Sequence, residues 1–126
     1  MGAGTIGGMN ELIVLDGSVT EEVSDVAADR LLEGKPVTRV ANYFSDSTQQ
    51  FHCGRWSATR GKWRVAYTEN ELCVMTAGKV VIESTSGERN TFASGAVFIV
   101  PAGFAGTWEV LEDCSKIYAI FEASAR

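Results

Sequence analysis

Short apolar runs alternate with turn-forming residues along most of the chain, from residue 37 to the C-terminus. The runs are rich in β-branched and aromatic side chains, and tripeptides such as RGK, AGK, SGE and PAG separate them, which is typical of strands joined by tight turns. The pattern predicts strands at residues 37–44, 50–59, 62–67, 71–76, 79–85, 90–93, 96–100, 106–110 and 116–122. Many short strands with no helical pattern between them indicate an all-β barrel or sandwich and disfavour parallel βαβ units.

The N-terminal part of the chain has a less regular pattern. The first ten residues are rich in glycine, so we expect a flexible segment there, followed by one domain over residues 11–126. Residues 12–15 predict a short strand. The only helical pattern spans residues 20–32, where the apolar spacing is imperfect, and it predicts one short helix or a set of turns.

Strand parity assigns side chains to faces, because successive residues of a strand point to opposite sides of the sheet. Glu71 shares one face of its predicted strand with Cys73, and Lys116 shares one face of the last predicted strand with Tyr118. Apolar residues also occupy the opposite faces of both strands. We therefore expect these strands to be covered on both sides, as in a barrel that dimerises or is overlaid by an arm.

Length and charge narrow the function classes. A chain of 126 residues fits one domain. The net charge of −5 disfavours nucleic acids and anionic membranes as partners, because phosphate groups are bound by basic patches. No apolar run approaches the roughly 20 residues of a membrane-spanning helix, and the N-terminus lacks the pattern of a secretory signal. Cys53, Cys73 and Cys114 are odd in number and lack framework spacing, which favours reduced thiols in a cytoplasmic protein.

Two segments carry a family resemblance. Residues 71–78, ELCVMTAG, resemble the end of the first cupin motif, a Glu with six residues before a Gly, and residues 95–103, GAVFIVPAG, resemble the start of the second. The segment between them fits the usual hairpin, with Gly87 in a turn. The words EGKP, GRW, GKWRV, YTENELC, PAGFAGTWEV and KIYAI are similar to short single-domain cupins related to (S)-ureidoglycine aminohydrolase, over roughly residues 30–122. The resemblance implies an all-β double-stranded β-helix, the cupin or jelly-roll barrel, with an N-terminal arm, and a homodimer.

The departures from the family pattern concern metal binding. The first cupin motif normally supplies two histidines before the glutamate, and here those places fall within residues 64–67, Arg-Val-Ala-Tyr. The second motif normally supplies a third histidine, and here that place is Gly106. Only Glu71 remains. One carboxylate cannot replace this ligand set, because first-row metal ions need several N, O or S ligands at about 2.0–2.3 Å. We therefore predict no metal and no other cofactor.

The resemblance places Glu71 inside the barrel, where it is either a general acid or ligand anchor, or a structural carboxylate paired with Lys116 or Tyr118. Lys116 could anchor a carboxylate or carbonyl of a substrate, and it could act as a nucleophile if it were deprotonated. Alternatively, its side chain reaches solvent at the barrel mouth. Cys73 is more simply a small buried hydrophobe than a nucleophile. His52, the only histidine, is more simply a hydrogen-bonded structural residue than a ligand.

Large aromatic side chains either line a pocket or fill the core of a small barrel. Trp108 is the best candidate for lining a pocket, because it follows the loop that normally carries the third histidine, and Trp56 is assigned instead to a dimer face. The candidate ligand-binding residues are Glu71, Cys73, Lys116, Tyr118, Trp108, Tyr67, Trp63 and Phe104.

Three functions are consistent with these residues. The first is an uncharacterised cupin that binds a small organic molecule, such as an acid or an amide, without the usual metal site. The second is an enzyme that acts on a ureido or amino-acid-like compound, which only the resemblance suggests. The third is a non-catalytic interaction barrel. No Ser/His/Asp set, phosphate loop or CxxC pair occurs in the sequence, so its motifs leave open whether the protein is an enzyme.

Overall fold

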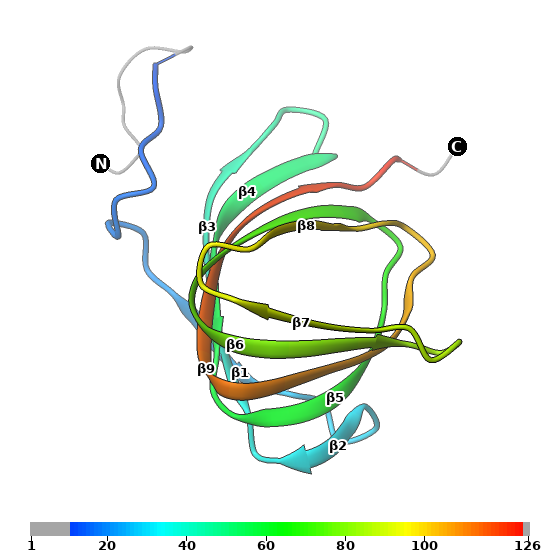
Figure 1. Cartoon of the computed structure of the whole chain (residues 1–126). Helices are drawn as coiled ribbons and strands as arrows, with labels where there is room; N and C mark the ends of the chain where they lie inside the picture. The colour runs from blue at the N-terminus through cyan, green and yellow to red at the C-terminus, as the bar shows by residue number, and fades with distance from the viewer. Residues whose placement is uncertain (1–10, 125–126) are drawn as a thin grey trace.

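The computed structural model describes residues 11–124, and these form nine strands and no helix (Figure 1). The strands are β1 (Glu22–Asp25), β2 (Leu31–Gly34), β3 (Val37–Ser45), β4 (Phe51–Ala58), β5 (Gly61–Ala66), β6 (Asn70–Ser84), β7 (Arg89–Ala93), β8 (Val97–Val100) and β9 (Ala105–Phe121). Every strand pair is antiparallel. The prediction of an all-β barrel is therefore confirmed. The glycine-rich first ten residues lie outside the described part of the chain.

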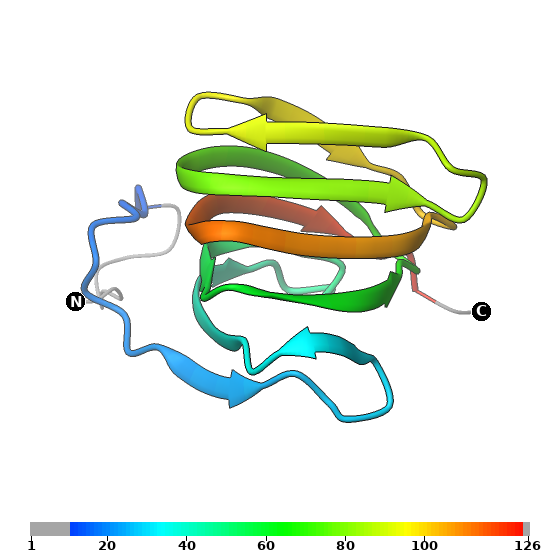
Figure 2. The ribbon, with the colours of Figure 1, turned by 60° about the horizontal axis from the view of Figure 1, so that its bottom comes forward.

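Two long strands form the frame of the barrel. β6 and β9 pair along almost their whole lengths, from Asn70 opposite Phe121 to Ser84 opposite Gly106. One half of β9 continues the sheet through β4, β3 and β1, and the other half continues it through β5 and β2. In the same way, β6 pairs with β8 over its first half and with β7 over its second. Figure 2 shows the strands stacked from the β7 and β8 side to the β1 and β2 side.

Both long strands bend where Gly78 faces Asp113. The register of β6 against β9 shifts three times between Met75 and Val80, which marks β-bulges. Gly78 has a φ of +82°, and a Cβ at this position would collide with the carbonyl oxygen of Asp113. Only glycine fits this bend. Consequently, the strands predicted at residues 71–76 and 79–85 join into β6, and those predicted at residues 106–110 and 116–122 join into β9.

The N-terminal predictions were met only in part. Residues 12–15 do not form a strand. Of the two alternatives for residues 20–32, the helix is absent, and a turn at residues 28–30 lies between β1 and the start of β2. β1 pairs with β3 through four residues, including Val23 opposite Arg39. This tertiary pairing outweighs a weak helical pattern. The described residues hold no helix that is long and apolar enough to cross a membrane.

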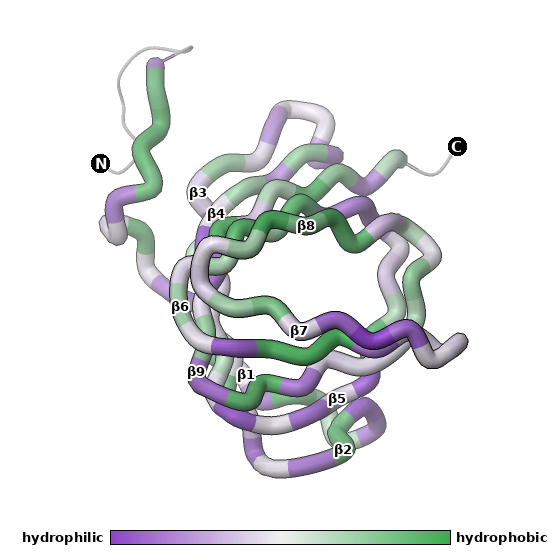
Figure 3. The backbone as a smooth tube through the Cα atoms, in the orientation of Figure 1, coloured by the Kyte–Doolittle hydropathy of each residue, from purple (hydrophilic) through white to green (hydrophobic). Residues whose placement is uncertain are grey.

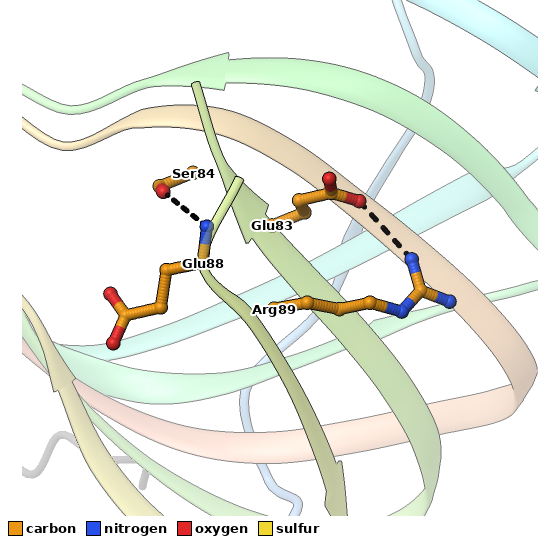
Figure 4. Close-up of polar contacts among 4 residues, drawn as sticks. All are labelled: Glu83, Ser84, Glu88 and Arg89. Atoms are coloured by element: carbon orange, nitrogen blue, oxygen red, sulfur yellow. Dashed lines mark hydrogen bonds and ion pairs between the residues drawn. The ribbon is translucent and has the colours of Figure 1, made fainter. Parts of the chain in front are cut away.

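The turn between β6 and β7 is closed by side chains. An Arg89 guanidinium nitrogen donates to the Glu83 carboxylate at 3.1 Å, and the Glu88 backbone N–H donates to Ser84 Oγ at 3.1 Å (Figure 4). Gly87 adopts a φ of +97°, a left-handed conformation that glycine adopts without strain. The prediction of Gly87 in a hairpin turn is therefore confirmed.

The alternation of faces predicted for β6 and β9 is also confirmed. Glu71 and Cys73 are buried, whereas Leu72 between them is exposed, and Lys116 and Tyr118 are buried on β9. The buried side chains face the interior, where the core includes Trp63, Met75, Val80, Trp108 and Val110. The expectation that both faces are covered is not met within one chain, because Leu72, Val97, Ile99 and Phe121 remain exposed on the outside.

Candidate functional site

The barrel interior holds a cavity of about 530 Å³. Its walls come from both halves of the barrel and from β1 and β3. Six of the eight candidate residues line it: Glu71, Lys116, Tyr118, Trp108, Tyr67 and Trp63. The other two, Cys73 and Phe104, lie behind the wall. Phe104 packs edge-on against Tyr67 with the ring centroids 6.2 Å apart, and it contacts the core.

A buried ion pair forms one wall of the cavity. Lys116 Nζ lies 2.8 Å from Glu71 Oε2, and the two side chains are 5% and 6% exposed. Lys116 therefore does not reach solvent at the mouth, and the lysine is the partner that Glu71 requires. Two charges are tolerated away from water only when they are paired and hydrogen-bonded. The pair thus places a fixed ammonium group and a fixed carboxylate at the cavity wall.

Tryptophan rings surround the ammonium group. Lys116 Nζ lies 4.6 Å from the ring centroid of Trp56 and 4.5 Å from that of Trp108, within the range of cation–π attraction. Trp63 stacks on Trp108 with an interplanar angle of 18°. Trp56 lines the cavity, so its assignment to a dimer face was wrong. All three tryptophans of the chain line the cavity.

Cys73 contacts the ion pair from the core side. Lys116 Nζ donates a hydrogen bond to Cys73 Sγ at 3.6 Å, and the thiol is fully buried. Burial raises the pKa of Cys73 to about 12, so the group is a neutral thiol at physiological pH. Thiolates, and not thiols, are the nucleophiles. Cys73 therefore belongs to the packing and hydrogen bonding of the wall, and the interpretation as a small buried residue fits the structure.

The cysteines are expected to differ in reactivity in the folded protein. At pH 8, iodoacetamide should label Cys53 first, because burial raises the pKa values of Cys73 and Cys114 to about 12 and about 11 and both side chains are shielded. Intact mass spectrometry should show one added group before the others, and three after unfolding in urea. Early labelling of Cys73, located by peptide mapping, would contradict the position of this residue.

Donor groups of the wall stay protonated at neutral pH. Burial raises the pKa of Tyr118 to about 12, and its hydroxyl donates to Asn42 Oδ1 at 2.7 Å. Burial, together with the charge of Glu71, raises the pKa of Tyr67 well above its ordinary value. The indole N–H of Trp108 is buried and makes no hydrogen bond of ordinary geometry within residues 11–124, although the Tyr67 hydroxyl lies near it. An unmatched buried donor costs about 1–3 kcal/mol, which an acceptor atom of a ligand would recover.

Sequence reasoning missed the cavity residues that come from outside the motifs. Asp25 of β1, Thr38 and Asn42 of β3, and Arg30 of the turn before β2 all line the cavity. A signal existed for Asn42, a polar residue among apolar ones in its strand, whereas the position of Asp25 depends on long-range pairing. His52 also lines the cavity, and its ring nitrogens contact Ser45 Oγ at 2.7 Å and the Gln49 carbonyl at 3.1 Å. These contacts agree with a structural histidine.

The residues at the motif positions do not fit a cupin metal. Of residues 64–67, the last three line the cavity with apolar and phenolic side chains, and Arg64 is exposed. At Gly106, a Cβ would overlap the carbonyl oxygen of Glu83, because β6 and β9 approach closely there. Glu71 is already paired with an ammonium group. Within the described ranges, no three His, Cys, Asp or Glu side chains are grouped as ligands.

An all-β barrel on two long bent strands, with a glutamate on β6 facing an interior cavity, defines a cupin. The chain belongs to the EutQ-like cupin domain family, whose model matches residues 46–118. This match supports the cupin part of the resemblance seen in the sequence and does not extend to (S)-ureidoglycine aminohydrolase in particular. No curated protein matches the chain.

Solved structures share the fold. A Pseudomonas syringae pv. tomato protein of unknown function from the DUF861 family superposes with a TM-score of 0.75 at 23% identity, over 84% of this chain and 46% of that one. The Clostridium difficile EutQ protein superposes with a TM-score of 0.62 at 18% identity, over 71% of this chain and 65% of that one. A putative ethanolamine utilization protein EutQ from Salmonella typhimurium superposes with a TM-score of 0.62 at 12% identity, over 86% of this chain and 100% of that one. This chain thus spans about half the length of the Pseudomonas protein, and the likeness concerns the fold.

Proposed function

We propose that this cupin binds a small organic molecule carrying a carboxylate or an amide carbonyl, and that it does so without a metal ion. The observation that carries the proposal is the buried Lys116 ammonium group at the cavity wall, and the buried indole N–H of Trp108 is a second donor there. An ammonium group has three N–H donors, and Glu71 and Cys73 account for two of them. The third N–H of the ammonium group remains for an acceptor, and an oxygen atom of a carboxylate or carbonyl in a ligand fits this role.

The shape and charge of the wall support a small ligand. A cavity of about 530 Å³ lies within the 300–1,000 Å³ that is usual for small-molecule sites. The tryptophan rings offer flat apolar surface, and the carboxylate of Glu71 is balanced by Lys116. Asp25, Glu69 and Arg30 add charges of both signs elsewhere on the lining. A ligand with a polar head and a flat or apolar body matches this distribution. The three free thiols are consistent with a cytoplasmic location.

Intrinsic fluorescence gives a direct binding assay, since all three tryptophans line the cavity. Titration with benzoate, N-carbamoylglycine and the amide of N-carbamoylglycine should change the emission for at least one compound and raise the melting temperature. The double variant E71M/K116M removes the polar wall and should lose at least about tenfold in affinity, the minimum expected for a charge-assisted hydrogen bond.

A surface ion pair supplies the matched control. Lys79 and Glu112 lie 3.9 Å apart with exposed side chains, so K79M/E112M removes the same charges outside the cavity and should bind as the wild type does. Equal binding by both double variants would overturn the assignment of the ion pair to the site. Failure of every compound to bind would favour the interaction barrel. Stoichiometric metal in protein purified without a nickel column would contradict binding without metal.

A catalytic function is the second candidate, and the contact between an amine and a carboxylate at the cavity wall favours it. The sequence words similar to (S)-ureidoglycine aminohydrolase suggest ureido compounds as the first substrates to test. Release of ammonia from N-carbamoylglycine by the wild type, and its loss in E71M/K116M but not in K79M/E112M, would establish an enzyme. Binding without turnover would leave the protein a binding cupin.

A further inference from the structure

A network of hydrogen bonds connects the loop between β3 and β4 to the cavity. The loop is hydrophilic (Figure 3). It supplies the Gln49 carbonyl, which lies 3.1 Å from His52 Nε2, and His52 Nδ1 lies 2.7 Å from Ser45 Oγ. Asn42 Nδ2 donates to Ser45 Oγ at 2.9 Å, and the Tyr118 hydroxyl donates to Asn42 Oδ1 at 2.7 Å. We call these five side chains and their contacts the His52 network, and it ends on a phenol at the cavity wall.

The loop end of the His52 network fixes its direction. A carbonyl oxygen only accepts, so His52 Nε2 carries the ring proton toward Gln49, and Nδ1 of the neutral ring then accepts from the Ser45 hydroxyl. The Asn42 amide has a second anchor, because its Nδ2 also lies 3.4 Å from the Phe44 carbonyl. Since Nδ2 is turned toward these two acceptors, Oδ1 faces the phenol and accepts its hydrogen bond.

A glycine between two strands lets the phenol reach Asn42. Gly54 of β4 lies opposite Tyr118 of β9 on one side and opposite Asn42 of β3 on the other. A Cβ at Gly54 would lie 2.8 Å from the Tyr118 hydroxyl oxygen, so the phenol passes directly over the glycine. Burial raises the pKa of Tyr118 to about 12, and the phenol keeps its proton at neutral pH. Within residues 11–124 this hydroxyl takes part in hydrogen bonding only as a donor, which leaves its oxygen free to accept.

Lys116 and Tyr118 therefore present opposite hydrogen-bonding groups to one cavity. They alternate on β9 and both line the cavity, with Cα atoms about 6.6 Å apart. The ammonium group offers an N–H donor, whereas the phenol uses its proton in the bond to Asn42 and offers an oxygen acceptor. A ligand that satisfies both groups has an acceptor and a donor a few bonds apart.

We infer that the ligand of this cupin carries an N–H or O–H donor beside its carboxylate or carbonyl group, and that Tyr118, oriented by Asn42, selects for that donor. The inference rests on the proposed function, because it concerns the ligand of the same cavity. It goes further in excluding ligands that only accept hydrogen bonds, and it assigns the exclusion to one side chain whose polarity is set from outside the cavity.

Two acids of matched shape test the ligand class. Succinamate and levulinate both carry a carboxylate and a carbonyl, and they differ only in an amide NH₂ group against a methyl group. Fluorescence titration of the wild type should give a dissociation constant for succinamate about tenfold lower than that for levulinate, the effect of one net hydrogen bond. Equal binding, or tighter binding of levulinate, would overturn the inference and leave the proposed function intact.

Substitution of Asn42 should change this preference while the phenol stays in place. In N42L the Tyr118 proton loses its acceptor, so the hydroxyl can donate to the levulinate carbonyl, and the preference for succinamate should fall below about threefold. The matched control is T38V, because Thr38 also lines the cavity from β3 and its hydroxyl contacts Ser24 instead of the phenol. T38V should keep the preference. A full preference in N42L, or its loss in T38V, would overturn the role of Asn42.

The direction of the His52 network has a test that needs no ligand and no variant. His52 is the only histidine of the sequence, so a long-range proton–nitrogen NMR spectrum at pH 8.5 reports on this ring alone. We expect a ring protonated at Nε2 only. Protonation at Nδ1, or a mixture of both tautomers, would overturn the inference. Binding of another compound, with neither succinamate nor levulinate bound, would overturn it as well, whereas failure of every compound would overturn the proposed function too.

Discussion

K116M is expected to lower the free energy of unfolding by about 3–5 kcal/mol, the usual cost of removing one partner from a buried ion pair. Glu71 is 6% exposed and pairs with Lys116 at 2.8 Å, so the variant leaves its carboxylate in the cavity wall without a counter-charge. The loss of the cation between Trp56 and Trp108 adds to the effect. Urea denaturation at neutral pH measures it.

Two comparisons separate the ion pair from general effects of substitution. K79M removes an exposed lysine from its ion pair and should cost less than about 1 kcal/mol. E71M/K116M removes both buried charges and should be markedly more stable than K116M, because two apolar side chains need no counter-charge. If K116M costs no more than K79M, or if the double variant is less stable than K116M, the buried pair does not have the role described.

G106A is expected to destabilise the protein by about 3–5 kcal/mol, a large effect for the addition of one methyl group. The Cβ would overlap the carbonyl oxygen of Glu83 on β6, and backbone atoms of a paired strand cannot move aside as a flexible side chain can. G106H, which restores the third motif histidine, should be at least as unstable. Thermal and urea unfolding measure both variants.

The control for this prediction is G87A. Gly87 adopts a φ of +97° and has no atom near the position of a Cβ, so its substitution tests only the cost of the left-handed conformation, about 1–2 kcal/mol. A G106A protein as stable as G87A would contradict the close approach of β6 and β9. Metal uptake by a folded G106H variant would contradict the conclusion that this position is closed to a histidine side chain.

The strand pattern of the sequence predicted the all-β fold well, and its errors have physical causes. The pattern separates residues 71–76 from residues 79–85 because glycine usually ends a strand. At Gly78 the chain bulges and continues instead, since the pairing with β9 resumes beyond the bend. The helical alternative for residues 20–32 failed because pairing with β3 and β5 decides that segment. Sequence periodicity is local and does not contain these pairings.

The candidate site was predictable where strand parity and motif position agreed. Both place Glu71 inside, and parity places Lys116 on the same face of its strand as Tyr118. The distance between Glu71 and Lys116 was not predictable, because it depends on the register of two strands far apart in the sequence. The same limit applies to Trp56, whose ring reaches Lys116 across the sheet between β4 and β9.

The two long strands also limit how the proposed ligand could enter the cavity. Because β6 and β9 run through both halves of the barrel, the halves cannot hinge apart without breaking a ladder that extends from Asn70 to Ser84. Asp25 of β1 and Asn42 of β3 line the cavity and are exposed, so we expect the proposed ligand to enter past these residues. A wall tied together by this ladder can change shape little, so the proposed ligand would be selected by the shape of the cavity as it stands, with little reorganisation of the protein.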